Sequence, residues 1–171
     1  VNGKMEVLFF TNVVLNAGQV GESEWAKRFI NEYENALPDE QRDSVVDYSF
    51  AHLCFYNKEF STALEYLAKV KYHSFYSKIE IRTLTLRIYY ELEETEAFEN
   101  LLDAIRHFLA DNQTMPDERK LFYTNFLNAV AGFHRFRLKP KMDRPDLPPQ
   151  FDPKKQNIGY RDWLLEKAKE F

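Results

Sequence analysis

The side chains that most often perform chemistry in proteins are sparse in this sequence. Its four histidines are His52, His73, His107 and His134. They do not lie at spacings typical of metal ligands, and the chain has no glycine-rich phosphate loop or distinctive pair of carboxylates. The single cysteine, Cys54, is flanked by Leu53 and Phe55, and an apolar context lowers thiol reactivity. We therefore expect no enzymatic activity, no metal site and no cofactor.

A second set of residues is suited to binding rather than to catalysis. Two rows of three lie 34 positions apart, Tyr48, His52 and Phe55 in the first and Arg82, Leu86 and Tyr89 in the second. Aromatic residues and arginine dominate the binding hot spots of protein interfaces. Whether the six share one surface depends on the elements that carry them.

Composition favours a helical protein with a real hydrophobic core. Of the 171 residues, 44% are hydrophobic and 16% aromatic, which argues against disorder. Only 5 residues are glycine and β-branched runs are few, which favours helices over strands. A net charge of -4 disfavours general nucleic-acid binding, and no apolar stretch is long enough to span a membrane.

The cysteine content and the start of the chain bear on its cellular context. A single cysteine cannot form an internal disulfide, which suits a reducing compartment, and we expect a cytoplasmic protein. The chain begins at Val1 rather than at a methionine, so we expect it to be a segment of a longer protein.

Apolar residues recur at helical spacing through most of the chain. Helices are expected over approximately 5–17, 24–37, 44–56, 60–70, 77–92, 95–110, 114–136 and 160–171. Ser23 is expected to cap the second of these, and Ser44 with Asp47 resembles a capping box before the third. The buried stripe of the second helix is expected to comprise Trp25 or Ala26, Phe29, Ile30, Tyr33 and Leu37.

A spacing of 34 residues links two of these helices. Ala63 and Ala97 lie 34 residues apart at the same place in two similar segments, and twelve residues before each lies the middle of another helix, near Ala51 and Thr85. A period of 34 built from two amphipathic helices is typical of a helical repeat array. Such arrays present a surface to a partner.

These residues resemble the tetratricopeptide repeat (TPR) family. One repeat offers Phe50-Ala51, Ala63 and Leu67, the next offers Leu84-Thr85, Ala97 and Leu101, and the first offers Ala26, Ile30 and a closing Pro38. Thr85 and Val70 depart from the small residues typical of the family. The C-terminal segment around Trp163 also resembles the end of uncharacterised Bacteroidetes repeat proteins. The resemblance implies an all-α fold, a right-handed superhelical stack of antiparallel helix pairs with a C-terminal capping helix.

The family resemblance also implies where a partner would bind. TPR arrays bind extended peptides along a concave face lined by the first helix of each repeat. Tyr48, His52 and Phe55 are expected to point away from the buried stripe, and the period places Arg82, Leu86 and Tyr89 beside them. The peptide-carboxylate clamp of the family needs several basic residues, and these rows supply only Arg82. We expect a protein or peptide partner, bound by a non-catalytic scaffold.

Two other functions stay open at this point. The segment can be a purely structural end-piece of a longer array, with Phe55, Leu86 and Tyr89 packed against the next repeat or the terminal helix. Alternatively, a closed pocket among Tyr48, His52, Arg82 and Tyr89 would make it a ligand-sensing regulatory domain.

The chain is expected to have three parts within one structural domain. Residues 1–136 are expected to form the TPR-like helical repeats, 137–159 a proline-rich basic loop, and 160–171 the capping helix. The loop carries five of the seven prolines, and proline disfavours helix. Its excess of lysine and arginine is typical of a solvated loop, or of a basic arm that binds an acidic protein or a phosphate-rich ligand.

Overall fold

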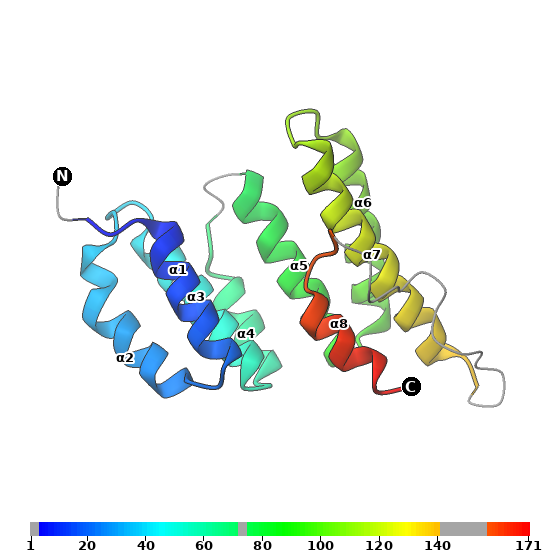
Figure 1. The fold of residues 1–171 in the computed structure, drawn as a ribbon, viewed down its shortest axis with the longest axis horizontal. Helices are drawn as coiled ribbons and strands as arrows, with labels where there is room; N and C mark the ends of the chain where they lie inside the picture. The colour runs from blue at the N-terminus through cyan, green and yellow to red at the C-terminus, as the bar shows by residue number, and fades with distance from the viewer. Residues whose placement is uncertain (1–3, 72–74, 141–156) are drawn as a thin grey trace. The chain divides into compact units, whose positions relative to one another are not determined.

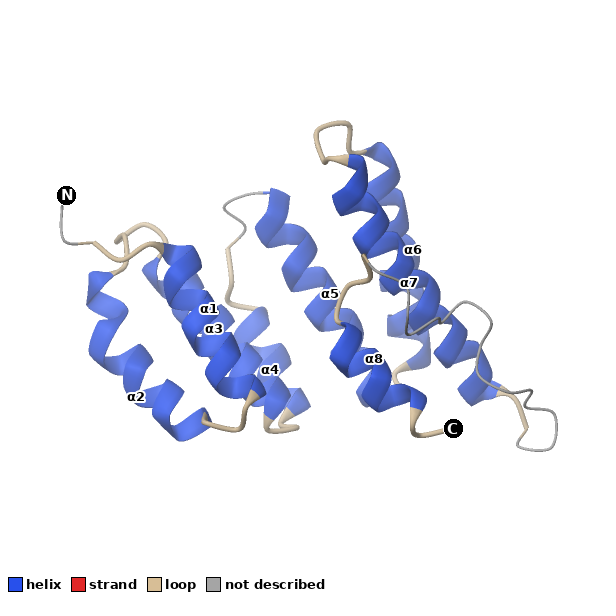
Figure 2. Ribbon diagram, in the orientation of Figure 1, coloured by secondary structure: helices blue, strands red, loops and turns tan. Residues whose placement is uncertain are grey.

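The computed structural model of the chain is helical throughout the part that it describes. It describes residues 4–71, 75–140 and 157–171, with the backbone alone for 75–77. Those residues form eight α-helices and one short 3-10 helix, without a β-strand (Figure 2). The all-α fold class predicted from the sequence is therefore confirmed.

The chain divides into two compact units, residues 1–97 (unit 1) and 98–171 (unit 2). The helices of unit 1 are α1 Val7–Gln19, α2 Ser23–Tyr33, the 3-10 helix η1 Glu34–Ala36, α3 Arg42–Tyr56, α4 Phe60–Leu67 and α5 Phe75–Glu91 (Figure 1). Helix α6, Thr95–Asp111, begins at the end of unit 1 and continues into unit 2, which also contains α7 Asp117–Leu138 and α8 Arg161–Ala168. None of the described helices is long and apolar enough to cross a membrane.

The same turn joins α1 to α2, α3 to α4 and α5 to α6. In each, one residue has a positive φ: Gly21 at 87°, Lys58 at 63° and Glu93 at 58°. In each, the amide after that residue donates to a carbonyl five positions back, at 2.8 Å, 2.8 Å and 3.0 Å. A left-handed residue in this position closes a helix by satisfying its last carbonyls. The turns recur after 37 residues (21 to 58) and 35 residues (58 to 93), close to the spacing predicted from the alanines.

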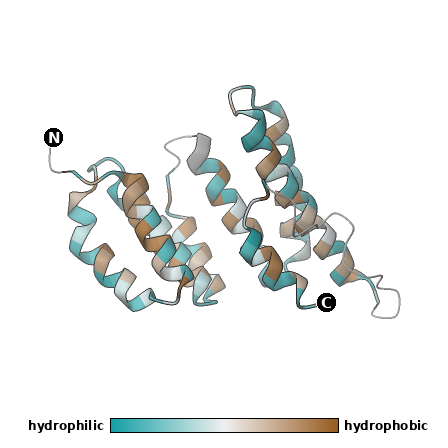
Figure 3. Ribbon diagram, in the orientation of Figure 1, coloured by the Kyte–Doolittle hydropathy of each residue, from teal (hydrophilic) through white to brown (hydrophobic). Residues whose placement is uncertain are grey.

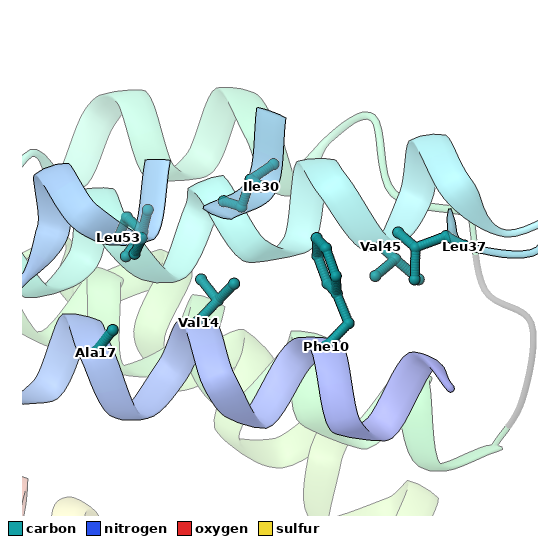
Figure 4. Packing of buried hydrophobic residues seen from close by; sticks show 8 residues of the cluster. Phe10, Val14, Ala17, Ile30, Leu37, Val45 and Leu53 are labelled. Atoms are coloured by element: carbon teal, nitrogen blue, oxygen red, sulfur yellow. The ribbon is translucent and has the colours of Figure 1, made fainter. Parts of the chain in front are cut away.

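The core of unit 1 forms where α1 meets α2 and α3. Phe10, Val14 and Ala17 of α1 point toward Ile30, Val45 and Leu53 (Figure 4). Burying an aliphatic or aromatic side chain of this size contributes about 1.5–3 kcal/mol. Ala26, Ile30 and Leu37 lie in this core as predicted, whereas Trp25 and Tyr33 are exposed and contact Phe29 at the surface.

The two serines predicted to cap helices form tertiary hydrogen bonds instead. Ser23 is the first residue of α2, and its hydroxyl donates to the side-chain oxygen of Asn57 at 2.7 Å. Ser44 lies inside α3, which begins two residues earlier, and its hydroxyl accepts from the backbone amide of Lys71 at 3.0 Å. Both predicted caps are therefore wrong, because these side chains join segments that are distant in the sequence.

Unit 2 is built around α7, whose side chains are buried on several sides. Phe98 of α6 packs against the ring of His134, with 4.4 Å between the centroids. The predicted loop 137–159 begins later than expected, because α7 continues to Leu138. Most of that loop, with four of its six lysine and arginine residues, lies outside the described part of the chain, in 141–156.

Helix α8 packs along α7 and runs in the same direction. The amide of Gly159 donates to the carbonyl of Phe122 at 3.1 Å, and the ring of Phe171 lies 4.9 Å from that of Phe136. Between these ends, Trp163 lies 6.3 Å from Phe126. A side chain at Gly159 would lie 2.9 Å from the Phe122 ring, so the close approach requires glycine.

Candidate functional site

The candidate site lies on α3 and α5, both within unit 1. Along α3, rings at every fourth position form a row, since one turn of helix separates each from the next. The His52 ring lies 4.6 Å from that of Tyr48, edge to face, and 6.1 Å from that of Tyr56. The far end of the row is fixed by α1, because Tyr56 packs against the backbone at Gly18. The row is therefore held by its own ring contacts and, at Tyr56, by packing against α1.

His52 is an unusual member of this row because it is 3% exposed and its two ring nitrogens lack a hydrogen-bond partner among the described residues. Burial, and secondly the positive charge of Arg87, hold the pKa of His52 well below its usual value. The imidazole is thus neutral at neutral pH. It serves as an aromatic packing element rather than as a charged contact.

A cation–π contact joins α5 to α3. The guanidinium carbon of Arg87 lies 4.7 Å from the centroid of the Phe55 ring, and Arg87 is itself buried. Phe55 also contacts Phe60 at the start of α4, with 5.8 Å between the rings. A buried guanidinium over a ring face is worth more than an exposed one, because water does not screen it. Phe55 therefore holds helix pairs together.

The six residues predicted for the binding face separate into two groups. Tyr48, Arg82 and Tyr89 are partly exposed and are accessible to a partner. His52, Phe55 and Leu86 are buried, so the expectation that they line an open groove is corrected for these three. The reason is that α3 and α5 are buried around most of their circumference. A residue on the side opposite to one buried stripe is therefore covered by another neighbouring element.

Sequence reasoning missed two residues of this region. Tyr56 and Arg87 were not among the candidates, although Tyr56 continues the ring row and Arg87 contacts Phe55. The sequence did indicate that Arg87 is unusual, because it is a single cation between Leu86 and Ile88 in an apolar helix. Such a residue is either buried or interrupts the apolar face of the helix. Tyr56 gave a weaker signal, because it precedes the polar turn at Asn57 and Lys58.

The titratable groups nearby do not form a reactive cluster. Cys54 is buried, and burial, followed by the charge of Glu59, raises the pKa of its thiol to about 11. A thiol with such a pKa is a poor nucleophile at neutral pH. In the described part of the chain, histidine, cysteine, aspartate and glutamate side chains do not gather in groups of three that could hold a metal ion.

Comparisons with protein-family models, with curated proteins and with solved structures find no match to this chain. The resemblance to TPR proteins therefore depends on the chain's own residues and turns.

Proposed function

We propose that this chain is a non-catalytic scaffold of TPR-like helical repeats that binds a protein or peptide partner in the cytoplasm. In this proposal the helix pairs α1–α2, α3–α4 and α5–α6 are successive repeats of a right-handed solenoid. The observation that carries it is the recurrence of one turn at Gly21, Lys58 and Glu93. Repetition of one supersecondary unit is the physical basis of such arrays, because each pair buries its apolar face against the next.

The partner would contact Tyr48, Arg82 and Tyr89, the partly exposed members of the two predicted rows. Two tyrosines and one arginine supply rigid aromatic area and a single positive charge. This chemistry favours an extended segment with apolar or aromatic side chains and an occasional carboxylate. It does not favour capture of a C-terminal carboxylate by several basic residues.

A second function is favoured by a specific observation. Three of the six predicted contact residues, His52, Phe55 and Leu86, are buried. That burial leaves less surface for a partner and suits a structural segment of a longer array. The experiment below separates this function from partner binding.

Site-specific photo-crosslinking tests the proposal. A benzophenone side chain replaces Tyr48 or Tyr89 in separate variants, and each variant is incubated with lysate from the source cell and irradiated. We expect the same partner to be crosslinked from both positions and to be lost when Arg82→Glu is added. Tyr33 on α2, which is also exposed, is the matched control position and should not crosslink that partner.

Circular dichroism must show that every variant folds, so that loss of crosslinking reports on contact. No crosslinked partner at Tyr48 or Tyr89, or the same products from Tyr33, would reject the binding face. The structural function would then be preferred.

A further inference from the structure

A cleft of about 330 Å³ lies between α6 and α7 in unit 2. Helix α6 contributes Arg106, Leu109 and Ala110, and α7 contributes Lys120, Thr124, Leu127 and Asn128. The two helices run antiparallel here, since Phe98 meets His134 near one end and Arg106 faces the Asn128 region farther along (Figure 1). Its volume lies at the lower end of the range of small-ligand pockets, about 300–1,000 Å³.

The base of the cleft is apolar and fixed. Leu109 and Leu127 line the cleft and are both buried, so each side chain packs mainly between the helices and only its edge borders the cleft. Ala110 beside them is small, which leaves room that a larger side chain would fill. A ligand that enters this cleft must therefore present an apolar group to the base.

The two charged residues that line the cleft are both basic, although the whole chain carries a net charge of -4. The described lining of the cleft includes Arg106 and Lys120 but no aspartate or glutamate. Arg106 contacts Asp103 at 3.3 Å, and both side chains of this pair are largely exposed. Exposed pairs contribute little, so Arg106 can exchange Asp103 for a bound anion at small cost. Thr124 and Asn128 add a hydroxyl and an amide that can donate hydrogen bonds.

We propose that this cleft binds a carboxylate carried on a short apolar group. The guanidinium of Arg106 and the ammonium of Lys120 take the negative charge, because charge-assisted hydrogen bonds to carboxylate are the strong ones. The apolar group covers Leu109 and Leu127. Such a ligand is either a small monocarboxylic acid or the C-terminus of a peptide with an apolar last residue. The inference uses residues of unit 2 and does not depend on the function proposed for α3 and α5.

A titration followed by amide NMR of the whole chain tests the inference. The probes are hexanoate, hexanamide, the peptide acetyl-Leu-Leu with a free carboxylate, and the same peptide with a C-terminal amide. We expect hexanoate, the free peptide or both to shift the amides of residues 106–110 and 120–128, and the two neutral probes to leave them unchanged. Shifts with hexanoate alone identify a small acid, and shifts with the free peptide alone identify a peptide terminus.

Variants at exposed or partly exposed positions then assign the charge. Lys120→Gln and Arg106→Gln should each weaken binding about tenfold, the usual effect of losing one charge-assisted hydrogen bond. Lys120→Arg should retain most of the affinity, and Thr124→Phe should abolish binding by filling the cleft. Lys169→Gln removes an exposed charge outside the cleft and is the matched control.

Three results would overturn the inference. They are the absence of shifts in these residues with every probe, equal shifts with the neutral probes, and unchanged affinity in both glutamine variants. Amide spectra of the free variants, compared with that of the parent, show that the fold is intact in each case.

Discussion

The hydroxyl of Ser23 donates a hydrogen bond of 2.7 Å to the side-chain oxygen of Asn57, the residue 34 positions later. Ser23 begins α2, and Asn57 closes α3. The bond therefore joins the turn of the first helix pair to the turn of the second. Two residues that lie 34 positions apart in the sequence are thus in direct contact between neighbouring helix pairs.

Replacing Ser23 with alanine should lower stability through the loss of this bond. Ser23 is buried, and one hydrogen bond contributes about 0.5–1.5 kcal/mol, which for a chain of this size lowers the melting temperature by about 1–6 °C. Thermal melts followed by circular dichroism measure the change. Ser61→Ala, at an exposed position of α4, is the control and should leave the melt unchanged. A Ser23→Ala melt identical to that of the parent would show that the contact contributes nothing.

Gly18→Ala should destabilise unit 1 although alanine is the better helix former. A methyl group there would lie 2.7 Å from the Tyr56 ring and 3.0 Å from Leu53, too close without a shift of the packed ring. Overpacking of this kind costs about 1–3 kcal/mol, more than the gain of about 1 kcal/mol in helix propensity.

A double-mutant cycle isolates the contact behind that effect. In a Tyr56→Ala background the nearest clash is removed and only the 3.0 Å approach to the end of the Leu53 side chain is left, so Gly18→Ala should cost clearly less than in the parent. Urea unfolding of the four proteins gives the coupling. If Gly18→Ala costs the same in both backgrounds, Tyr56 is not the group that excludes a side chain.

His52 should make stability depend on pH. Burial and Arg87 lower the pKa of His52 in the folded state, so between that pKa and about 6.5 the unfolded chain binds more protons than the folded one. The stability that the neutral His52 ring contributes is fully present when the pH is above the pKa of this histidine in the unfolded chain. It is lost as the pH falls, at about 1.4 kcal/mol per pH unit.

His52→Phe keeps a ring in the same space and should reduce this slope. The residual slope would come from His134, whose pKa is lowered by burial although Glu99 opposes the shift. Urea unfolding free energies at several pH values give both slopes. Equal slopes in parent and variant would mean that His52 becomes protonated as readily in the folded state as in the unfolded one.

Cys54 should be unreactive in the folded protein. With a thiol pKa of about 11, only roughly one thiol in a thousand is ionised at pH 8, and burial limits access as well. Alkylation by iodoacetamide, followed by mass spectrometry, should modify the chain in denaturant and leave the native chain unmodified. Fast modification under native conditions would place Cys54 at an accessible surface.

Loss of α8 should expose the apolar surface of α7. Trp163→Ala removes a buried side chain that lies against Phe126, and should cost about 3 kcal/mol. Deletion of residues 160–171 should lower the melting temperature further and increase binding of a hydrophobic dye. Lys169→Ala, at the exposed residue that follows α8, is the control. An unchanged melt after the deletion would refute a stabilising role for this helix.

The positions of the helices could be predicted from the sequence more fully than the exposure of their residues. A single stripe of apolar residues along the helix was enough to predict α4 and α6, which bury mainly one face. The same periodicity failed at His52, Phe55 and Leu86, because α3 and α5 are packed by several neighbours and a stripe marks only one of them. Ser23 and Ser44 failed for a related reason, since a hydroxyl suited to capping is equally suited to a tertiary bond that local spacing does not show.

In helix α1 the failure is the reverse, because some of its apolar residues are exposed rather than buried. Hydrophobic residues lie along much of its length (Figure 3). Two of them, Leu8 and Phe9, are 70% and 58% exposed. Periodicity indicates that such a helix has a buried face, and Phe10 and Val14 form it. It does not indicate which of the remaining apolar residues stay in water, because that depends on what packs beside the helix.

The helices of unit 1 contact helices that are near them in the sequence, and this affects how quickly unit 1 can fold. Each helix packs against the next along the chain, or against the one after it, as α1 does with α3 and α3 with α5. Contacts of such short sequence separation require little loop closure, and proteins built from them fold fast, in microseconds to milliseconds. Each helix can also begin to pack as soon as the next one or two helices have been synthesised. Unit 1 can therefore fold progressively as it leaves the ribosome.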